Sequence, residues 1–501
     1  MKIYSVKTKA IYLLLCLFLC AFQMSCKKLI EVGEPINTLT TTEIFSTDAT
    51  ATSAMAGVYS DMINGPNGGS ASGAAGSIYS AGLSTLLGGE SSDEFYVYSS
   101  AGVLDVVASD HLTALLPGST TSIWNSAYDI IYKSNSVIQG VAASTSTLLH
   151  DSVRNELTAE AKFTRAFSYF YLTNFFGDVP MVLTVDFNKT ENLPRMPRQQ
   201  VYQQIISDLK DAQAGLARDF SVGNGERIIP NKWAAALLLA RVYLYTGNHY
   251  ADAAAQASAV INNSSLFGLE PDLNNVFSTT SREAVWQLKQ TSSDAIMENA
   301  TSEGLAFGSN DADGHGIPGD ILTSQLLSAF EPGDQRRVKW VDSLDHADYP
   351  SIPPGWFYYP RKYITDLLNR NSGAPPPQYY MALRLAEAYL IRAEAEANGA
   401  AGGTAAAITD LNVIRNRAGL PNLNTGLNQQ QAIGAVAQER RIEFFAEWGH
   451  RWFDLKRTGQ AHAVLSVMSE KQPWAGDYQL LYPIPLTEIQ ADHFLTQNPG
   501  Y

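Results

Sequence analysis

Apolar residues recur at the spacing of an amphipathic helix in three long segments of the chain. In residues 123–137, Trp124 and Tyr128 fall on one face of the predicted helix. Residues 201–216 repeat the pattern and leave Asp208 among the polar positions that we expect to face solvent. Both segments therefore predict helices that pack one side against a core.

The third segment, residues 155–176, carries a wide stripe of aromatic side chains. The stripe consists of Phe163, Phe167, Phe170 and Tyr171. Gly177 follows the segment directly, and Pro180 lies three residues further on, which is the usual signal for the end of a helix. We therefore expect a helix that ends at Gly177 and buries its aromatic side in the core.

Two later segments, residues 239–243 and 385–389, share the pattern Leu-Ala-x-x-Tyr. Each is followed by a glycine-containing turn and then by a second alanine-rich stretch. The pattern is typical of the first helix of a tetratricopeptide repeat, in which the small residue lets the partner helix approach closely. The predicted fold class is mostly α-helical: a tetratricopeptide-like scaffold of helix pairs, with an irregular loop-rich ligand-binding region and a few short strands.

An insertion of about residues 262–378 interrupts the helix pairs, and its composition differs from theirs. Residues 284–290 alternate between two faces and predict a strand. Glycine-rich and proline-rich stretches follow this strand, and residues 65–89 form another glycine- and serine-rich stretch. Binding functions usually reside in long loops on a rigid scaffold, so these stretches are the candidate ligand-binding regions.

The composition narrows the possible functions further. The chain has 501 residues and a formal net charge of -14, from 35 Lys and Arg against 49 Asp and Glu. A strongly acidic protein is a poor partner for nucleic acid, so we expect no such partner. Hydrophobic residues make up 45% of the chain, which excludes disorder along its whole length. The eight histidines show no metal-ligand spacing, and no nucleotide or hydrolase motif is present, so we predict no metal, cofactor or catalytic residue.

Residues 1–25 have the features of a secretory signal peptide. Three lysines precede an apolar run that is too short to cross a bilayer. Cys26 follows directly and is the predicted site of acyl lipid attachment, the alternative being a soluble secreted protein in which Cys26 has no role. We expect residues 26–39 to form a lipidated tether and residues 40–501 to form the folded domain.

Residues 439–457, with the sequence ERRIEFFAEWGHRWFDLKR, closely resemble the C-terminal hallmark of the SusD/RagB family. Other stretches that resemble the family follow in the right order, namely residues 161–180, 331–337, 414–420 and 497–501. The similarity extends over essentially the whole chain after its signal segment. On these residues the chain is identified as a SusD-like protein.

This resemblance implies a lipoprotein of a Gram-negative bacterium, anchored in the outer membrane and facing the exterior. Such proteins form a lid on a TonB-dependent transporter of the SusC type, and they capture oligosaccharides for import without catalysing any reaction. The implied fold has four tetratricopeptide-like helix pairs and a more irregular region that carries the ligand face. The implied partners are an oligosaccharide or polysaccharide, a SusC-like transporter and the membrane.

Charged side chains are dense within residues 439–457, and they invite a catalytic interpretation. On a helix, however, Glu447 and Arg451 are four residues apart, and so are His450 and Asp454, so that each pair is in reach. Interspersed aromatic residues indicate that the segment is buried. We therefore expect a core helix in which arginines and carboxylates satisfy one another.

Sugar capture requires aromatic faces that stack on pyranose rings and polar groups that bond to hydroxyls. Aromatic residues in loops are the candidates, because those on amphipathic helices, such as Trp124, Trp233 and Trp452, are expected in the core. The predicted ligand-binding residues are Tyr79, Tyr96, Tyr98 and Trp356 for stacking, and Asp93 and Glu94 for hydroxyl groups. Because shape and stacking dominate such a site, we expect weak affinity with little dependence on salt.

Two other function classes remain open at this point. One is a binding protein for a non-sugar nutrient such as a peptide, because aromatic residues are sparse between Thr291 and Gly319. The other is a tetratricopeptide-type assembly scaffold that binds only a protein partner. An enzyme is the least favoured class, and the sequence does not name the sugar, its linkage or its length.

Overall fold

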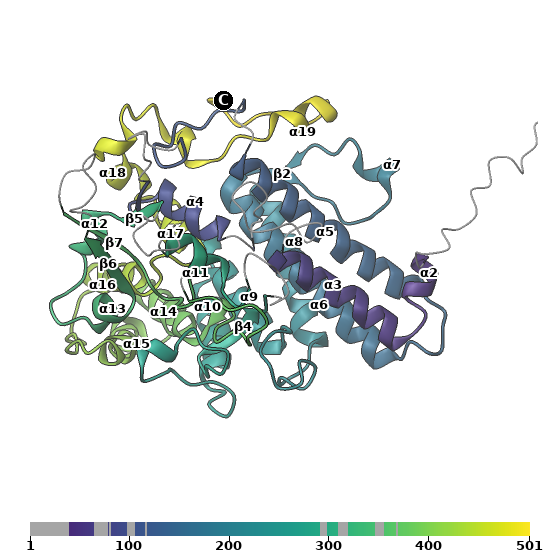
Figure 1. Ribbon diagram of the computed structural model, residues 1–501, viewed down its shortest axis with the longest axis horizontal. Coiled ribbons are helices and arrows are strands. Elements are labelled where there is room, and N and C mark those ends of the chain that lie inside the picture. The colour runs from purple at the N-terminus through teal and green to yellow at the C-terminus, as the bar shows by residue number, and fades with distance from the viewer. Residues whose placement is uncertain are drawn as a thin grey trace, which may run out of the picture. The chain divides into compact units, whose positions relative to one another are not determined.

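Long helices that pack side by side form the larger part of the fold (Figure 1). The computed structural model describes residues 40–64, 79, 82–97, 106–115, 118–290, 298–308, 319–345, 355–366 and 369–501. Residues 45–501 form one unit, and the described part of the remaining unit ends with the short helix α2 (Thr41–Ile44). The following description concerns the larger unit.

Among the described residues, nine long helices are arranged in space in the same order as along the chain. They are α3 (Asp48–Asn64), α5 (Ser119–Ala143), α6 (Asp151–Phe176), α8 (Arg198–Gly215), α9 (Lys232–Thr246), α10 (Tyr250–Ile261), α14 (Leu385–Ala397), α15 (Gly403–Arg417) and α16 (Gln429–Glu443). Each of these helices contacts the next one in this order. The prediction of a mostly helical fold built from repeat-like helix pairs is confirmed.

Shorter helices and strands complete the described part of the unit. The helices are α4 (Leu83–Ser91), α7 (Phe187–Thr190), α11 (Ser302–Phe307), α12 (Ser324–Leu327), α13 (Gln335–Lys339), α17 (His450–Arg457), α18 (Ala461–Leu465) and α19 (Leu486–Ala491), with 3-10 turns η3 (Leu273–Asn275), η4 (Ser469–Lys471) and η5 (Asp477–Leu480). The strands are β1 (Phe95–Val97), β2 (Val179–Pro180), β3 (Arg195–Met196), β4 (Ala284–Leu288), β5 (Asp320–Leu322), β6 (Val341–Asp345), β7 (Trp356–Pro360) and β8 (Tyr380–Arg384).

The aromatic stripe of α6 forms the centre of the core. Its four aromatic side chains each expose 1% of their surface or less. The Phe167 ring lies 5.2 Å from that of Trp286 on β4 and 5.3 Å from that of Trp448, both edge to face. The helix ends at Gly177, whose φ of 78° favours a residue without a side chain. The predicted end and the predicted buried side of α6 are both confirmed.

A buried ion pair joins the two helices that carry the Leu-Ala-x-x-Tyr pattern. Arg241 on α9 and Glu387 on α14 occupy the same position of the pattern, directly after the alanine. The Arg241 Nε and Nη2 atoms donate to the two Glu387 carboxylate oxygens at 2.5 and 2.6 Å. Both side chains are buried, so each charge is compensated by the other.

Two expectations about α8 and α9 were wrong. Asp208 is buried rather than solvent-facing, because its carboxylate accepts hydrogen bonds from Arg165 Nε and Nη2 at 2.8 and 2.7 Å. The partner arginine lies on α6, so hydropathy along α8 alone could not reveal the pair. Trp233 is only half-buried, because it lies in the first turn of α9 and its ring nitrogen donates to the Arg218 carbonyl at 2.9 Å. Trp124 and Trp452 are core residues, as expected.

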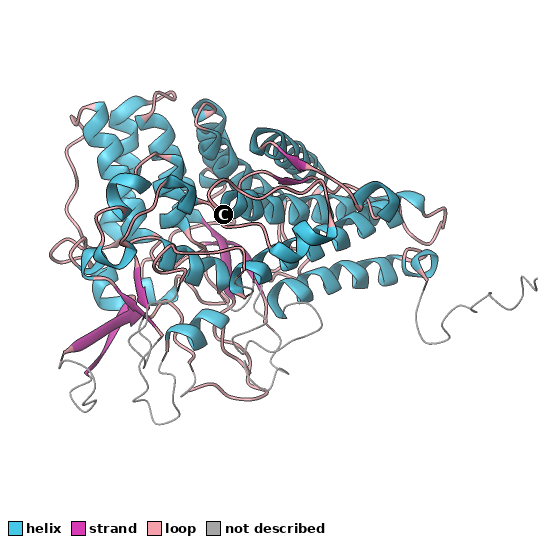
Figure 2. Ribbon diagram, turned by 90° about the horizontal axis from the view of Figure 1, so that it is seen from above, coloured by secondary structure: helices cyan, strands magenta, loops and turns pink. Residues whose placement is uncertain are grey.

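The insertion leaves the helical scaffold between α10 and α14, which pack directly against each other. Its first strand, β4, falls within the predicted segment 284–290 and pairs antiparallel with β8. The β1–β5 and β6–β7 ribbons are also antiparallel, and β5 contacts β7. Figure 2 shows the longer ribbon extending from one side of the helices.

The hallmark segment 439–457 is not one helix, which corrects the sequence-based expectation. Helix α16 ends at Glu443, and α17 begins at His450. Between them Ala446, Trp448 and Gly449 have positive φ values of 52°, 51° and 69°, which no helix continues through. The break lies within the predicted pair Glu447 and Arg451, and each of these residues pairs with a partner from elsewhere in the chain, whereas His450 and Asp454 both lie on α17.

The expected mutual satisfaction of the charged hallmark residues is nevertheless confirmed. Arg440 donates to Asp454 at 2.8 Å, across the break between the two helices. Glu447 accepts hydrogen bonds from Arg384 at 2.9 Å and also from Lys362. All of these side chains are largely buried, and each touches an oppositely charged group.

Two glycines bring α4 against the start of α17. A Cβ atom on Gly88 would lie 2.4 Å from the Gly449 Cα. Cβ atoms in real structures essentially never come this close to another heavy atom. We expect Gly88→Ala to lower the free energy of unfolding by about 1–3 kcal/mol, because the neighbour is backbone and must shift. The matched control is Gly434→Ala on α16, where nothing lies within 4 Å and alanine should stabilise the helix by about 1 kcal/mol. Chemical denaturation of both variants checks the prediction, and equal effects would contradict it.

Candidate functional site

The β6–β7 ribbon presents an exposed tryptophan beside a carboxylate. The register places Trp356 opposite Asp345 and Tyr358 opposite Ser343, and alternation along each strand puts these four side chains on one face. Trp356 exposes 57% of its surface, and Asp345 is also exposed. Side chains directly opposite each other in such a pair are about 5 Å apart. An indole face and a carboxylate therefore stand side by side at the open end of the ribbon.

The other end of the ribbon is anchored in the protein. Trp340 is buried just before β6, and its ring nitrogen donates to the Leu273 carbonyl at 3.0 Å. The Arg361 backbone N–H donates to the Trp340 carbonyl at 2.8 Å, and the Arg361 side chain pairs with Asp342. The guanidinium of Arg337 covers the Tyr358 ring, 4.5 Å from its centroid. The Trp356 ring is therefore exposed to solvent, on a ribbon whose other end is held in place by these contacts.

Tyr96, another predicted ligand residue, lies on the neighbouring ribbon. It is half-buried in β1 and pairs with Ile321 of β5, the strand that contacts β7. Phe95, one position earlier, points to the other face, where its ring lies 5.2 Å from that of Phe307. The structure therefore brings the strands of Tyr96 and Trp356, which are 260 positions apart in sequence, into adjacent ribbons.

Tyr79 does not face solvent, contrary to the expectation for a loop aromatic. Its side chain is completely buried, and its ring stacks on Phe167 at 6.0 Å between centroids. Its hydroxyl donates to the Ser168 hydroxyl, and burial raises the pKa of Tyr79 well above the usual range of a tyrosine. In this position Tyr79 packs against the aromatic stripe of α6.

Asp93 and Glu94 are also inside the protein, which corrects the expectation that they accept hydroxyls from a sugar. The Asp93 carboxylate accepts hydrogen bonds from Arg451 at 2.6 and 2.9 Å and from Arg441 at 2.8 Å. Burial opposes the ionised form, but the hydrogen bond and charge of Arg451 outweigh it, so the pKa of Asp93 is lowered. Asp93 therefore holds the segment before β1 against the C-terminal helices.

The Glu94 carboxyl is buried beside Asp93. Burial, followed by the nearby Asp93 charge, raises the pKa of Glu94 to about 8. The backbone N–H of Ala446 donates to it at 3.3 Å, and the Glu94 carbonyl accepts from the Thr323 N–H at 2.9 Å. The sequence pattern gave no sign of this burial, because the residues that enclose Glu94 come from the insertion and from the hallmark segment.

Two predicted site residues, Tyr98 and Cys26, lie outside the described residues, as do the signal segment and the whole of the predicted tether. Within the described ranges, no three His, Cys, Asp or Glu side chains come together as a metal site. No helix among the described residues is long and apolar enough to cross a membrane.

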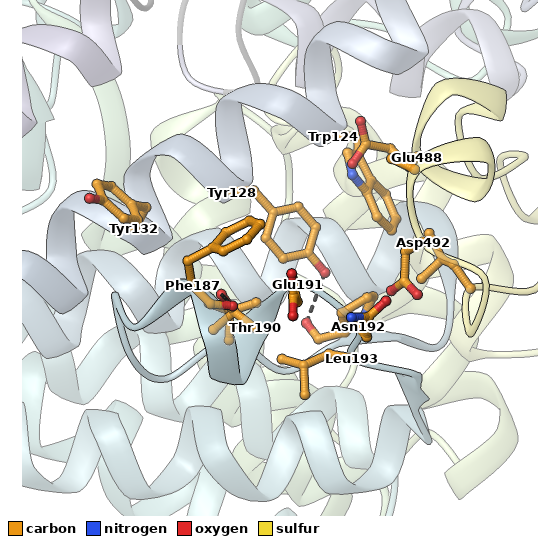
Figure 3. Close-up of a pocket in the computed structure, with 14 residues that line it drawn as sticks. Trp124, Tyr128, Tyr132, Phe187, Thr190, Glu191, Asn192, Leu193, Glu488 and Asp492 are labelled. Carbon is orange, nitrogen blue, oxygen red and sulfur yellow. Dashed lines mark hydrogen bonds between the residues drawn. The ribbon is translucent and has the colours of Figure 1, made fainter. Parts of the chain in front are cut away.

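A cavity that the sequence did not indicate lies at a different place in the larger unit. It has a volume of about 460 Å³ and is bounded by α5, by the segment around α7 and by the segment around α19 (Figure 3). Its aromatic lining residues are Trp124, Tyr128, Tyr132 and Phe187, and its acidic ones are Glu191, Glu488 and Asp492. The helical periodicity assigned Trp124 and Tyr128 to the buried face of α5, but it gave no sign that the C-terminal segment completes a cavity there.

Comparisons with known proteins identify the family. A family model described as "SusD family" matches residues 351–501, and a second, described as "Starch-binding associating with outer membrane", matches residues 88–244. Together they include the hallmark segment, α6 and the segment around β1. This chain is a member of the SusD family.

Relatives and solved structures of the SusD family agree with this assignment. The chain is 28% identical to SusD-like protein P2 of Formosa agariphila over 422 residues, which are 77% of this chain and 81% of the relative. It is 26% identical to the starch-binding protein SusD of Bacteroides thetaiotaomicron over 421 residues, covering 68% and 72% of the two chains. A laminarin-binding SusD-like protein has a similar fold, with a TM-score of 0.72 at 23% identity, covering 91% of this chain and all of that one.

In this SusD-family chain, the charged hallmark is a structural element. Its carboxylates and arginines are engaged with one another and with Asp93, Lys362 and Arg384. On the β ribbons, the described groups that face outward include the exposed indole of Trp356, the exposed Asp345 side chain and the half-buried ring of Tyr96. Such an arrangement can stack on a flat ligand.

Proposed function

We propose that this chain is a glycan-binding lipoprotein of the cell surface, which captures an oligosaccharide and passes it to a SusC-type TonB-dependent transporter. Attachment through an acyl lipid on Cys26 holds it to the outer membrane, facing the exterior, and it catalyses no reaction. Relatives named for binding starch and laminarin, and a surface glycan-binding protein of Bacteroides fluxus with a TM-score of 0.70, support the glycan assignment.

The observation that carries the proposal is the exposed Trp356 ring next to Asp345. An indole face offers a flat apolar surface to the C–H face of a pyranose, and a carboxylate beside it accepts hydrogen bonds from sugar hydroxyls. The anchored base of the ribbon holds the ring in place before the ligand arrives, which reduces the entropy lost on binding. Tyr96, on the adjacent ribbon, is the second ring of the proposed site, and Tyr98 stays a prediction.

The proposal predicts that Trp356→Ala weakens oligosaccharide binding about tenfold or more. The loss corresponds to about 1.4 kcal/mol or more, the size expected for one stacked ring. The measurement is isothermal titration calorimetry with starch- and laminarin-derived oligosaccharides, on the chain expressed from residue 27. Trp356→Phe keeps an aromatic face and should retain most of the affinity.

The matched control is Leu148→Ala. Leu148 lies between α5 and α6 and exposes 64% of its side chain, close to the value for Trp356. Its removal should leave binding unchanged. Oligosaccharide binding that persists in Trp356→Ala would move the site elsewhere, and no binding across a broad sugar panel, with capture of peptides instead, would favour a non-sugar nutrient.

A further inference from the structure

The cavity between α5, α7 and α19 has the features of a built ligand site. Trp124 and Tyr128 form its floor, with their ring centroids 5.0 Å apart and their planes inclined by 51°. The Trp124 ring packs edge to face on Phe176 at 5.1 Å, and the Tyr128 hydroxyl donates to the Pro180 carbonyl at 2.8 Å. These contacts fix both rings, so the cavity is formed before any ligand binds.

Two further aromatic side chains stand at the mouth of the cavity. Tyr132 exposes 54% of its surface and Phe187 exposes 68%. Figure 3 shows Tyr132 toward one end of the cavity, with Trp124 and Glu488 toward the other. Single exposed aromatic residues are common on protein surfaces, but a cavity edged and floored by four of them presents an unusually large amount of ring surface.

The charged residues that line the cavity are all acidic. Glu191, Glu488 and Asp492 line it, and none of its fourteen lining residues, all described, is a lysine, arginine or histidine. Arg195 is close enough for its charge to favour the ionised form of the Tyr128 hydroxyl. Its guanidinium donates hydrogen bonds to the carbonyls of Asp178 and Thr496. Lys133, next to Tyr132 in sequence, is paired with Asp61 and Asp129.

Carboxylates and aromatic faces favour the same kind of ligand. A protonated amine is attracted by the carboxylates and by the negative face of each ring, and its carbon skeleton gains contact area on the rings. A ligand with negative charge is repelled, and a neutral ligand uses only the rings and hydrogen bonds.

We propose that this cavity binds an organic ligand that carries a protonated amino group, of the size of one or two amino-sugar rings. In this site the amino group lies near Glu488 and Glu191, and the ring body lies on Tyr128 and Phe187. The cavity is separate from the β6–β7 ribbon, so this second site goes beyond the proposed function and does not depend on it.

The test compares two disaccharides with the same sugar rings, one with protonated amines and the other with neutral acetamides at the same positions. The glucosamine dimer is titrated into the chain expressed from residue 27 at pH 6, where its amines are protonated, and the di-N-acetylated dimer serves as the neutral partner. We expect the amine form to bind at least tenfold more tightly, with an affinity that falls as salt concentration rises. Equal binding of the two dimers, or no binding of the amine form, overturns the proposal.

Two variants locate the binding. Phe187→Ala removes a ring that is mostly exposed, and Glu191→Gln with Glu488→Gln removes two charges outside the core, so that both proteins should fold. Each is expected to weaken binding of the glucosamine dimer about tenfold, whereas Trp356→Ala leaves it unchanged. If Trp356→Ala abolishes the binding and the cavity variants do not, the amine form uses the ribbon and the proposed cavity site is wrong. This pattern also separates a failure of the cavity from a failure of the glycan site.

Discussion

Replacing Glu443 by glutamine is expected to lower the free energy of unfolding by about 3–5 kcal/mol, which is a large part of the stability of a folded domain. Glu443 is completely buried, and its carboxylate is the meeting point of three arginines. Arg336 donates to it at 2.9 Å and Arg384 at 2.5 Å, and Arg417 forms the third pair. The glutamine keeps the shape of the side chain but leaves the surrounding guanidinium charges undercompensated.

The titration behaviour of Glu443 agrees with this expectation. Burial opposes ionisation, but the charges of Arg417, Arg384 and Arg336 outweigh it, so the pKa of Glu443 lies well below its usual range. A lowered folded-state pKa means that the contribution to stability is present at neutral pH and is lost only as pH falls through the acidic range.

The measurement is guanidinium chloride denaturation at pH 7, with Asp211→Asn as the control. Asp211 pairs with Lys162 at 2.7 Å, but 55% of its side chain is exposed. Surface pairs of this kind contribute less than about 1 kcal/mol, so the control should change the free energy of unfolding very little. A Glu443→Gln variant that loses no more stability than the control would show that the arginine cluster does not depend on this carboxylate.

The helices could be predicted from the sequence because their signals are local. A stripe of aromatic residues that ends at a glycine is enough to define α6, and two copies of the Leu-Ala-x-x-Tyr pattern define α9 and α14. The physical reason is that burial of one helix face repeats every three to four residues, whichever element covers that face. The same reasoning placed the hallmark arginines and carboxylates in a buried network, which the structure confirms.

The candidate site could be predicted only in part, because exposure depends on residues that are distant in sequence. Trp356 lies on an open ribbon, whereas Asp93 and Glu94, chosen for the same chemistry, are enclosed by Arg441, Arg451 and Ala446. No local pattern distinguishes an acidic residue at a surface from one that meets an arginine some 350 positions away. The cavity beside α5 could not be predicted for the same reason, since two of its three acidic residues, Glu488 and Asp492, come from the C-terminal segment.

The second large expected effect is a loss of stability as pH rises through neutrality. Three buried carboxyls, those of Glu94, Glu160 and Glu303, have pKa values raised to about 8. Burial is the main cause in each case, because these groups have few charge partners inside the protein. A carboxyl whose folded-state pKa lies above its unfolded value of 4.5 stabilises the fold most below that value. Its contribution declines as pH rises from 4.5 to about 8.

Between its unfolded and its folded pKa value, each such carboxyl lowers the free energy of unfolding by up to about 1.4 kcal/mol per pH unit. The carboxyls with lowered pKa values, including those of Asp93 and Glu443, change protonation at lower pH and leave the window from pH 6 to 9 unaffected. We therefore expect the free energy of unfolding to fall when pH is raised from 6 to about 8, and to level off above that value, where these carboxyls are ionised in both states. Urea denaturation at half-unit intervals of pH measures this slope.

Glu303→Gln separates this explanation from a general effect of net charge. The Glu303 side chain is buried, with the Thr85 hydroxyl 3.4 Å from one of its oxygens, and the neutral amide fits the place of the protonated acid. The variant should lose part of the slope and be more stable than the native chain at pH 9, by about 1 kcal/mol or more. Glu191→Gln makes the same change of charge at an exposed position, so its stability should follow the native pH profile. If both variants reduce the pH dependence of the free energy of unfolding equally, that dependence arises from repulsion among surface charges and not from the burial of Glu303.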